Sequence, residues 1–144
     1  MRKRLKTSLL ILCAVFLLTA LSGSIKPDKA KIFHLVTHHH DLLTDCIESG
    51  DYSRAKLFLT IKDVSQRNQT VDFLCDGWGL GSQTEYEGFF YSPDDDMTAL
   101  WAIPEDIEVL SPYGSGYLWD EAEGDNRCYI EHIVGHFYYY EASF

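Results

Sequence analysis

The stretch RCYIEHIVGHFYYYEA, residues 127–142, decides which kind of structure the second half of the chain forms. Its β-branched and aromatic side chains, above all the aromatic run at residues 137–140, favour an extended strand. A helix is the alternative, because four apolar residues also recur at helical spacing: Ile130, Ile133, Val134 and Phe137. We predict one long final strand, with Gly135 marking a bulge within it.

Alternation of apolar and polar residues, interrupted by turn signals, extends upstream from this stretch to about Thr60. One such signal is the run Ser92-Pro93-Asp94-Asp95, which suits a type I turn because proline fits its second position. Because the segments are short and separated by turns, we expect an antiparallel meander of about five to seven strands. The predicted strands lie near residues 60–66, 70–78, 85–91, 98–103, 107–110, 116–121 and 127–142.

The chain before these strands has helical periodicity. Apolar residues recur along one stripe between residues 27 and 49, and Gly50 is a natural stop. Asp51 can cap a second, short helix at residues 52–58. The sequence therefore predicts an α+β fold, with one long and one short N-terminal helix packed on the sheet, in a single domain at residues 25–144. The long stripe consists of Ile32, Leu35, Val36, His39, Leu42, Leu43, Cys46 and Ile47, and the short one of Ala55, Phe58 and Leu59.

Residues 1–24 have the composition of a secretory signal peptide. Four positive charges precede an almost wholly apolar run at residues 8–21, and the small residues Ser22, Gly23 and Ser24 follow it. The apolar run is shorter than the roughly 20 residues of a membrane-spanning helix. We expect a secreted or extracytoplasmic protein with no other membrane contact; retention by an uncleaved N-terminal anchor is the alternative.

Charge is distributed unevenly along the predicted domain. Residues 25–68 hold six acidic and seven basic side chains, whereas residues 69–144 hold sixteen acidic side chains and a single basic one, Arg127. Such a surface repels phosphate backbones, so we expect no nucleic-acid partner. It attracts cationic proteins, cationic peptides or divalent cations, although a solvated acidic face is the simpler alternative.

The acidic half is also rich in aromatic residues, which alternate onto both faces of the predicted strands. If one face is the core, the other is an exposed aromatic and acidic surface; a second buried face or a dimer interface is the alternative. We predict a non-catalytic contact with a cationic protein or peptide, and a carbohydrate- or cell-wall-binding module as the alternative function. The predicted contact residues are Trp78, Tyr91, Asp94, Asp95, Tyr138 and Tyr140.

The long predicted helix carries a polar face with metal-ligating side chains. His34, His38, Asp41 and Asp45 are spaced so that two imidazoles and a carboxylate can meet zinc or copper. One straight helix rarely closes a tetrahedral site, so a further ligand would have to come from elsewhere. An ordinary polar face is the alternative, and we expect no cofactor.

Three cysteines lie in the predicted domain: Cys46, Cys75 and Cys128. In an oxidising compartment two of them are expected to form a disulfide, and the sequence does not choose the pair. A Cys/His hydrolase is disfavoured, because Cys128 and His132 on one strand face lie about 13 Å apart. Pairing of Cys75 with His132 or His136 is the remaining catalytic alternative, and we expect no enzyme.

Five segments of the chain together resemble one family. They are VDFLCDGWG at 71–79, GFFYSPDD at 88–95, GYLWDE at 116–121, GDN at 124–126 and FYYYEASF at 137–144. The set is similar to an uncharacterised family of small exported hypothetical proteins of Gram-positive gut bacteria, over residues 50–144. The resemblance implies export and a shared fold, and it implies no catalytic residue.

Overall fold

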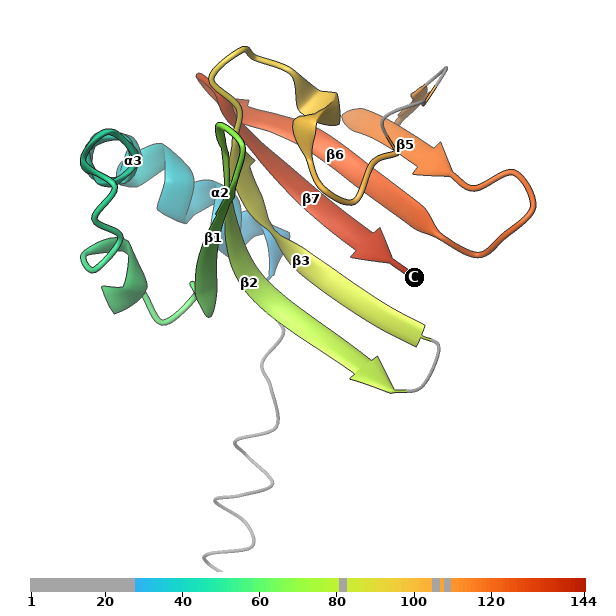
Figure 1. The fold of residues 1–144 in the computed structure, drawn as a ribbon, viewed down its shortest axis with the longest axis horizontal. Helices are drawn as coiled ribbons and strands as arrows, with labels where there is room; N and C mark the ends of the chain where they lie inside the picture. Colours follow the sequence, from blue (N-terminus) through green and yellow to red (C-terminus); the bar gives the residue numbers. More distant parts are fainter. Residues whose placement is uncertain (1–27, 81–82, 105–106, 108–109) are drawn as a thin grey trace, which may run out of the picture.

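The computed structural model describes residues 28–80, 83–104, 107 and 110–144. The predicted signal segment, residues 1–24, lies outside the described residues. Figure 1 shows N-terminal helices followed by a seven-stranded antiparallel sheet. The predicted α+β class with antiparallel strands is therefore confirmed. No helix in the described ranges is long and apolar enough to span a membrane.

The strands follow the order β1-β2-β3-β7-β6-β5-β4 across the sheet, and each strand is antiparallel to its neighbours. Their bounds are β1 (Asp63–Arg67), β2 (Thr70–Leu80), β3 (Gln83–Tyr91), β4 (Ser111–Tyr113), β5 (Gly116–Asp120), β6 (Arg127–Val134) and β7 (Phe137–Ser143).

This order differs from the meander that the sequence predicts. After β3 the chain leaves the sheet as residues 92–110, which we call the crossover, and re-enters at the far edge as β4. The later strands return by hairpins, so that β7 pairs with both β3 and β6. The prediction is wrong because the apolar side chains of the crossover cover one face of the sheet and do not extend it.

The described residues of the crossover contain neither of the two strands predicted there. Residues 98–103 overlap the 3₁₀ helix η2 (Met97–Ala99), where the side chain of Asp96 accepts a hydrogen bond of 2.8 Å from the backbone N–H of Thr98. Residues 107 and 110 lie outside any strand. The side chains that made this segment resemble strands are instead buried against the sheet: Leu100, Ala102 and Ile103.

The final stretch is extended, as predicted, but it forms two strands and not one. β6 and β7 make a hairpin whose turn lies at Gly135 and His136, and Gly135 has a φ of 56°. Glycine adopts this left-handed conformation without steric strain, so the residue reverses the chain. The register shift of the hairpin falls between His132 and Val134 and not at Gly135.

The predicted long helix is broken into α2 (Lys29–His38) and α3 (His40–Ser49). They meet at His39, whose φ of −119° and ψ of 23° are not helical. Asp28 caps the start of α2, and Gly50 ends α3 with a φ of 69°, as its position in the sequence predicts. The break leaves both helices on one core, which their side chains enter at Ile32, Leu35, Val36, Leu43 and Cys46.

The predicted short helix at residues 52–58 is reduced to one 3₁₀ turn, η1 (Ala55–Leu57). Ala55 is buried and Phe58 packs partly against the core. Leu59, which the helical stripe places in the core, is fully exposed. A single turn is too short to carry Leu59 back onto the face that holds Ala55.

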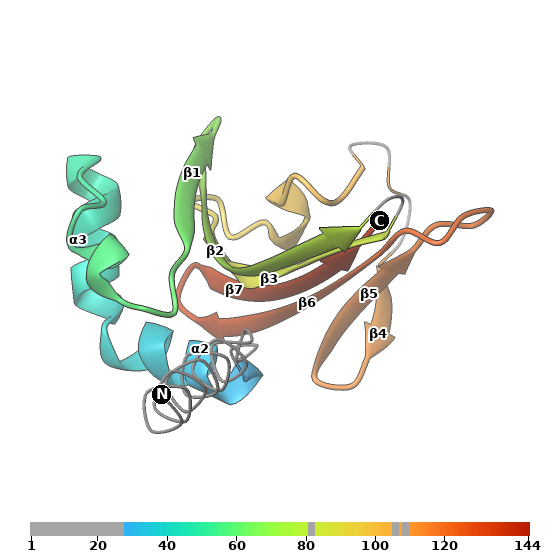
Figure 2. The ribbon, with the colours of Figure 1, turned by 90° about the horizontal axis from the view of Figure 1, so that it is seen from below.

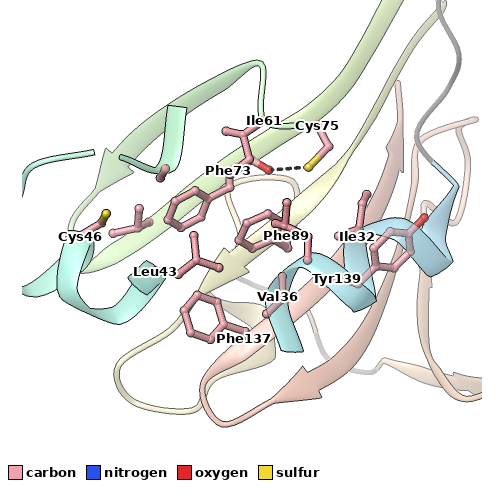
Figure 3. Close-up of a cluster of buried hydrophobic side chains, with 13 residues drawn as sticks. Ile32, Val36, Leu43, Cys46, Ile61, Phe73, Cys75, Phe89, Phe137 and Tyr139 are labelled. Carbon is pink, nitrogen blue, oxygen red and sulfur yellow. Dashed lines mark hydrogen bonds between the residues drawn. The ribbon is translucent and has the colours of Figure 1, made fainter. Parts of the chain in front are cut away.

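The sheet is buried on both faces. Figure 2 shows α2 on one side of it and the crossover on the other. The core between helices and sheet, which we call the helix-side core, is drawn in Figure 3; in it Phe73 and Phe89 stack with ring centroids 4.6 Å apart. The opposite core, under the crossover, contains Phe90, Leu100, Ile130, Tyr138 and Tyr140. The expectation of an exposed aromatic second face is therefore wrong, because the crossover covers it.

One half-buried carboxylate ties the crossover to the sheet. Asp72 of β2 accepts a hydrogen bond of 3.0 Å from the indole N–H of Trp101 and one of 2.9 Å from the hydroxyl of Tyr140. Burial raises the pKa of Asp72, and these two donors oppose the rise. Removal of either donor would leave this half-buried acceptor poorly satisfied.

We expect Trp101→Phe to lower the free energy of unfolding by about 1–2 kcal/mol, because the indole donor is lost. Urea unfolding followed by circular dichroism measures the change. Trp78→Phe makes the same replacement at a side chain that is 60% exposed, and should cost under about 0.5 kcal/mol. Equal losses in the two variants would show that the bond to Asp72 does not stabilise the fold.

Candidate functional site

Two rows of side chains continue the helix-side face of the sheet beyond its core. Strand register defines them, because residues paired across antiparallel strands lie on the same face. The first row contains Trp78, Glu85, Ser143, Arg127 and Asp120. The second row contains Asp76, Glu87, Glu141, Tyr129 and Leu118. We call these the outer rows; five of their ten side chains are carboxylates and one is cationic.

A pocket of about 550 Å³ lies over the outer rows, and we call it the sheet groove. Lys29, at the start of α2, lines it on one side, and Tyr113 to Ser115 of the β4–β5 hairpin line it on the other. Figure 2 shows α2 and this hairpin on the same side of the sheet. Between them the lining includes Glu85, Arg127, Tyr129 and Glu141.

The groove already holds one ammonium group, that of Lys29. Its Nζ atom forms an ion pair with Glu131 and lies 3.5 Å from the hydroxyl oxygen of Tyr129. The same atom lies 5.0 Å from the ring centroid of Tyr129, 5.5 Å from that of Phe33 and 5.4 Å from that of Tyr139. A carboxylate and three aromatic rings are the chemistry that recognises a cation.

The ion pair fixes the charge of both partners near neutral pH. Burial alone would raise the pKa of Glu131, but hydrogen bonds from Lys29 and Tyr129 outweigh it and the pKa is lowered. Burial alone would lower the pKa of Lys29, but the hydrogen bond and charge of Glu131 outweigh it and the pKa is raised. Both groups are therefore poor proton donors or acceptors near pH 7, and their role is electrostatic.

We expect Glu131→Gln to lower the free energy of unfolding by about 1 kcal/mol at pH 7, a figure kept low because Lys29 is partly exposed. A carboxylate with a lowered pKa stabilises the fold above its unfolded pKa, and this contribution is lost as the pH falls through the folded pKa. The difference from wild type in urea unfolding should thus be full above the unfolded pKa of about 4.3, shrink as the pH falls below it, and vanish once the pH is below the lowered folded pKa. A matched control is Glu48→Gln, on the exposed side of α3. A difference that persists unchanged at low pH would contradict the assignment.

The carboxylates on the floor of the groove are held in place by a buried tyrosine. The hydroxyl of Tyr139 lies 2.6 Å from an oxygen of Glu87 and also contacts Glu141. Burial, followed by these two carboxylates, raises the pKa of Tyr139, so its hydroxyl stays protonated as a donor. Tyr139 therefore fixes the position of Glu141, which lines the groove, and of Glu87, which is buried behind it.

Carboxylates outnumber cations around the groove. Among its described lining residues and those directly behind them, four are acidic, namely Glu85, Glu87, Glu131 and Glu141. The two cations are Lys29, paired with Glu131, and Arg127, whose Nε lies 3.3 Å from a carboxylate oxygen of Asp120. The excess of negative charge favours a cationic ligand.

The six contact residues predicted from the sequence do not form one surface. Trp78 is 60% exposed and lies in the first outer row, at the edge of the groove face. Tyr91 is half-buried at the opposite end of β3 from Glu85, and Asp94 and Asp95 are exposed in the turn that follows it.

Tyr138 and Tyr140 are only 3% and 0% exposed, beneath the crossover. The hydroxyl of Tyr138 donates to a carboxylate oxygen of Asp95 at 2.6 Å, which holds the crossover in place. Their prediction as contact residues is wrong, because strand alternation identifies which residues share a face and not whether that face is covered.

The predicted metal site is not assembled. The break at His39 separates His34 and His38 on α2 from Asp41 and Asp45 on α3. The two imidazoles stack with centroids 3.8 Å apart, and Asp45 lies 3.8 Å from a guanidinium nitrogen of Arg54. Among the residues with described positions, no group of three or more His, Cys, Asp or Glu side chains is arranged to hold a metal ion.

The expected disulfide is absent from the described residues: Cys46, Cys75 and Cys128 are free and buried. Cys46 and Cys75 lie in the helix-side core, whereas Cys128 lies on the other side of the sheet. Burial raises the pKa of Cys75 strongly and that of Cys128 to about 12. Neither thiol is a nucleophile at neutral pH.

The two histidines of the catalytic alternative contact other groups. Nε2 of His132 lies 2.8 Å from the carbonyl oxygen of Gly135, and Nδ1 of His136 lies 3.1 Å from that of Ser92. Cys75 contacts the carbonyl oxygen of Phe73 at 3.7 Å. These contacts give no support to a Cys/His pair.

We expect the three thiols to resist alkylation by iodoacetamide at pH 8 in the folded protein and to react fully in denaturing urea, because all three are buried and the raised pKa values of Cys75 and Cys128 keep these two protonated. Mass spectrometry of tryptic peptides measures labelling at each cysteine. Rapid labelling of Cys75 or Cys128 in the folded protein would contradict the buried, protonated thiols.

Comparison with known proteins finds no matching family model, no matching curated protein and no matching solved structure. The resemblance to exported proteins of Gram-positive gut bacteria stays a prediction. The sequence reasoning missed the groove residues Lys29, Tyr113, Tyr129, Glu131 and Glu141. Each looks like an ordinary surface residue in its own segment. Strand register brings Tyr129, Glu131 and Glu141 together, and the packing of α2 and the β4–β5 hairpin adds Lys29 and Tyr113.

Proposed function

We propose that the protein is an exported, non-catalytic binding protein that holds a cationic segment of a partner protein or peptide in the sheet groove. One observation carries the proposal: the ammonium of Lys29 is bound there by a carboxylate and three aromatic rings. A partner's lysine or arginine brings the same chemical group to the carboxylates next to it.

The groove offers further places for such groups. Glu85 and Glu141 line it, on strands β3 and β7, which pair directly. Tyr113, which is 59% exposed, faces them from the hairpin wall and adds an aromatic surface for an aliphatic or guanidinium side chain. Export is part of the proposal because of the signal-like composition of residues 1–24.

The charge of the whole acidic half supports the same partner class. Residues 69–144 carry sixteen acidic side chains and one basic side chain. A negative electrostatic field accelerates the encounter with cationic chains and repels anionic ones. Salt weakens this field, with a screening length of about 10 Å at 0.1 M ionic strength.

A second candidate, carbohydrate binding, is favoured by the exposed tyrosines of the β4–β5 hairpin. Tyr113 and Tyr117 are 59% and 40% exposed, and such rings stack on sugar faces. A neutral oligosaccharide would bind independently of salt, which separates this function from the first.

We expect fluorescein-labelled hexalysine to bind, with an affinity that falls steeply between about 50 and 500 mM NaCl. Glu141→Gln should weaken binding about tenfold, equivalent to about 1.4 kcal/mol, because one charge-assisted contact is lost. Fluorescence anisotropy measures both effects. Asp125→Asn, the same loss of charge in the exposed β5–β6 loop outside the groove, should weaken binding less than twofold.

Two results would reject the proposal. One is hexalysine binding that Glu141→Gln and Asp125→Asn weaken equally, which would indicate a diffuse charge effect. The other is failure of the charge requirement at low salt, seen either as no binding of hexalysine or as equal binding of hexaglutamate.

A further inference from the structure

Half of β2 is an open edge of the sheet. β1 pairs with β2 from Arg67↔Thr70 to Asp63↔Leu74, and β2 continues to Leu80. Beyond Leu74 the described residues provide β2 with one strand neighbour, β3. Figure 1 shows β2 and β3 extending together past the end of β1.

The free backbone groups of this edge come from two glycines. Thr84 exchanges both of its backbone hydrogen bonds with Phe144, at 2.8 and 2.9 Å, on the side of β3 that faces β7. Its pair partner on β2 is Gly79, which must therefore direct its own N–H and C=O away from β3. Gly77, two residues earlier, points the same way. Neither residue has a side chain that would hinder an approaching backbone.

The other edges of the sheet are better protected than this one. β4 is only three residues long and has Pro112 at its centre, and β1 is five residues long with Asp63 and Arg67 at its ends. The open part of β2, residues 76–80, reads DGWGL and contains neither proline nor lysine. An unprotected edge is a template for an added strand.

The side chains along the edge select the charge of that strand. Asp76 and Trp78 lie on the helix-side face, paired with Glu87 and Glu85 of β3. Basic side chains opposite Asp76 and Trp78 would meet a carboxylate and an indole. Lys62, from the segment before β1, already forms an ion pair with Asp76.

The other face of the edge selects apolar side chains. The ring of Tyr86 lies 3.4 Å from the position that a Cβ atom would occupy at Gly77. A residue opposite Gly77 would therefore place its side chain beside this ring. The preferred strand alternates basic and apolar residues.

We propose that the cationic partner binds as an extended segment that adds antiparallel to the β2 edge at residues 76–80, with basic residues opposite Asp76 and Trp78 and apolar ones opposite the glycines. This deepens the proposed function, on which it rests, by naming the mode of recognition. A second copy of the chain is disfavoured, because its edge segment DGWGL would bring a carboxylate and no basic side chain to Asp76 and Trp78.

The test uses a six-residue peptide in which three lysines alternate with three valines, with an acetylated N-terminus and an amidated C-terminus. Two further forms carry methyl groups on the backbone nitrogens, one form at the valines and the other at the lysines. In the added strand the valine amides face Gly77 and Gly79, and the lysine amides face solvent. We expect methylation of the valine backbone nitrogens to weaken binding at least tenfold. Methylation of the lysine backbone nitrogens should weaken binding less than threefold. Bound peptide should also slow hydrogen exchange at Gly77 and Gly79 at least tenfold.

A pair of protein variants tests the same edge from the other side. Gly77→Pro removes the outward N–H and should weaken binding of the unmethylated peptide at least tenfold. Gly77→Ala keeps the N–H and should bind this peptide at least fivefold more tightly than Gly77→Pro does. The N-methylated peptides keep the test decisive if Gly77→Pro does not fold.

The outcomes separate the two proposals. If neither hexalysine nor the alternating peptide binds wild type, the proposed function fails. If both bind but the two N-methylated peptides are equivalent, only the strand-addition mode is overturned. A wild-type dimer in light scattering that Gly77→Pro abolishes would overturn it in favour of self-pairing.

Discussion

The aromatic run at residues 137–140 in the central strand β7 is the constraint on which the rest of the structure depends. Its side chains alternate between the two faces, so Phe137 and Tyr139 enter the helix-side core while Tyr138 and Tyr140 enter the core under the crossover. A strand that is aromatic on both faces must be covered on both. The helices cover one face and the described residues of the crossover cover the other.

The tyrosines of this run also explain part of the chain's acidity. Each buried hydroxyl needs an acceptor, and the acceptors are carboxylates: Asp95 for Tyr138, Glu87 and Glu141 for Tyr139, and Asp72 for Tyr140. Burial raises the pKa of all three hydroxyls, with the nearby carboxylates adding to the effect. Several acidic residues of the sheet are therefore structural, and the negative charge is not only a solvated surface.

The groove and the open edge share one face of the sheet. Trp78 and Glu85 belong to the first outer row, which begins at the edge of β2 and continues to Arg127 on β6, and Glu85 also lines the groove. A segment bound at the edge and a side chain bound in the groove would meet the same set of carboxylates. This arrangement depends on the bulge between Leu74 and Asp76, where Asp76 comes to share the face of Glu87.

The sequence by itself determined the α+β class, the approximate place of most strands and the end of the helical region at Gly50, because these depend on local periodicity and backbone freedom. It predicted a bulge at Gly135, where the structure instead reverses the chain. It also determined the acidic and aromatic composition of the sheet. The tertiary structure alone decided that β7 lies between β3 and β6, that the crossover buries Tyr138 and Tyr140, and that the helical region breaks at His39. It also decided that Lys29 meets Glu131, about a hundred residues away in the chain. Alternation along a strand states which residues share a face, but only long-range pairing decides what covers that face and which carboxylates become neighbours.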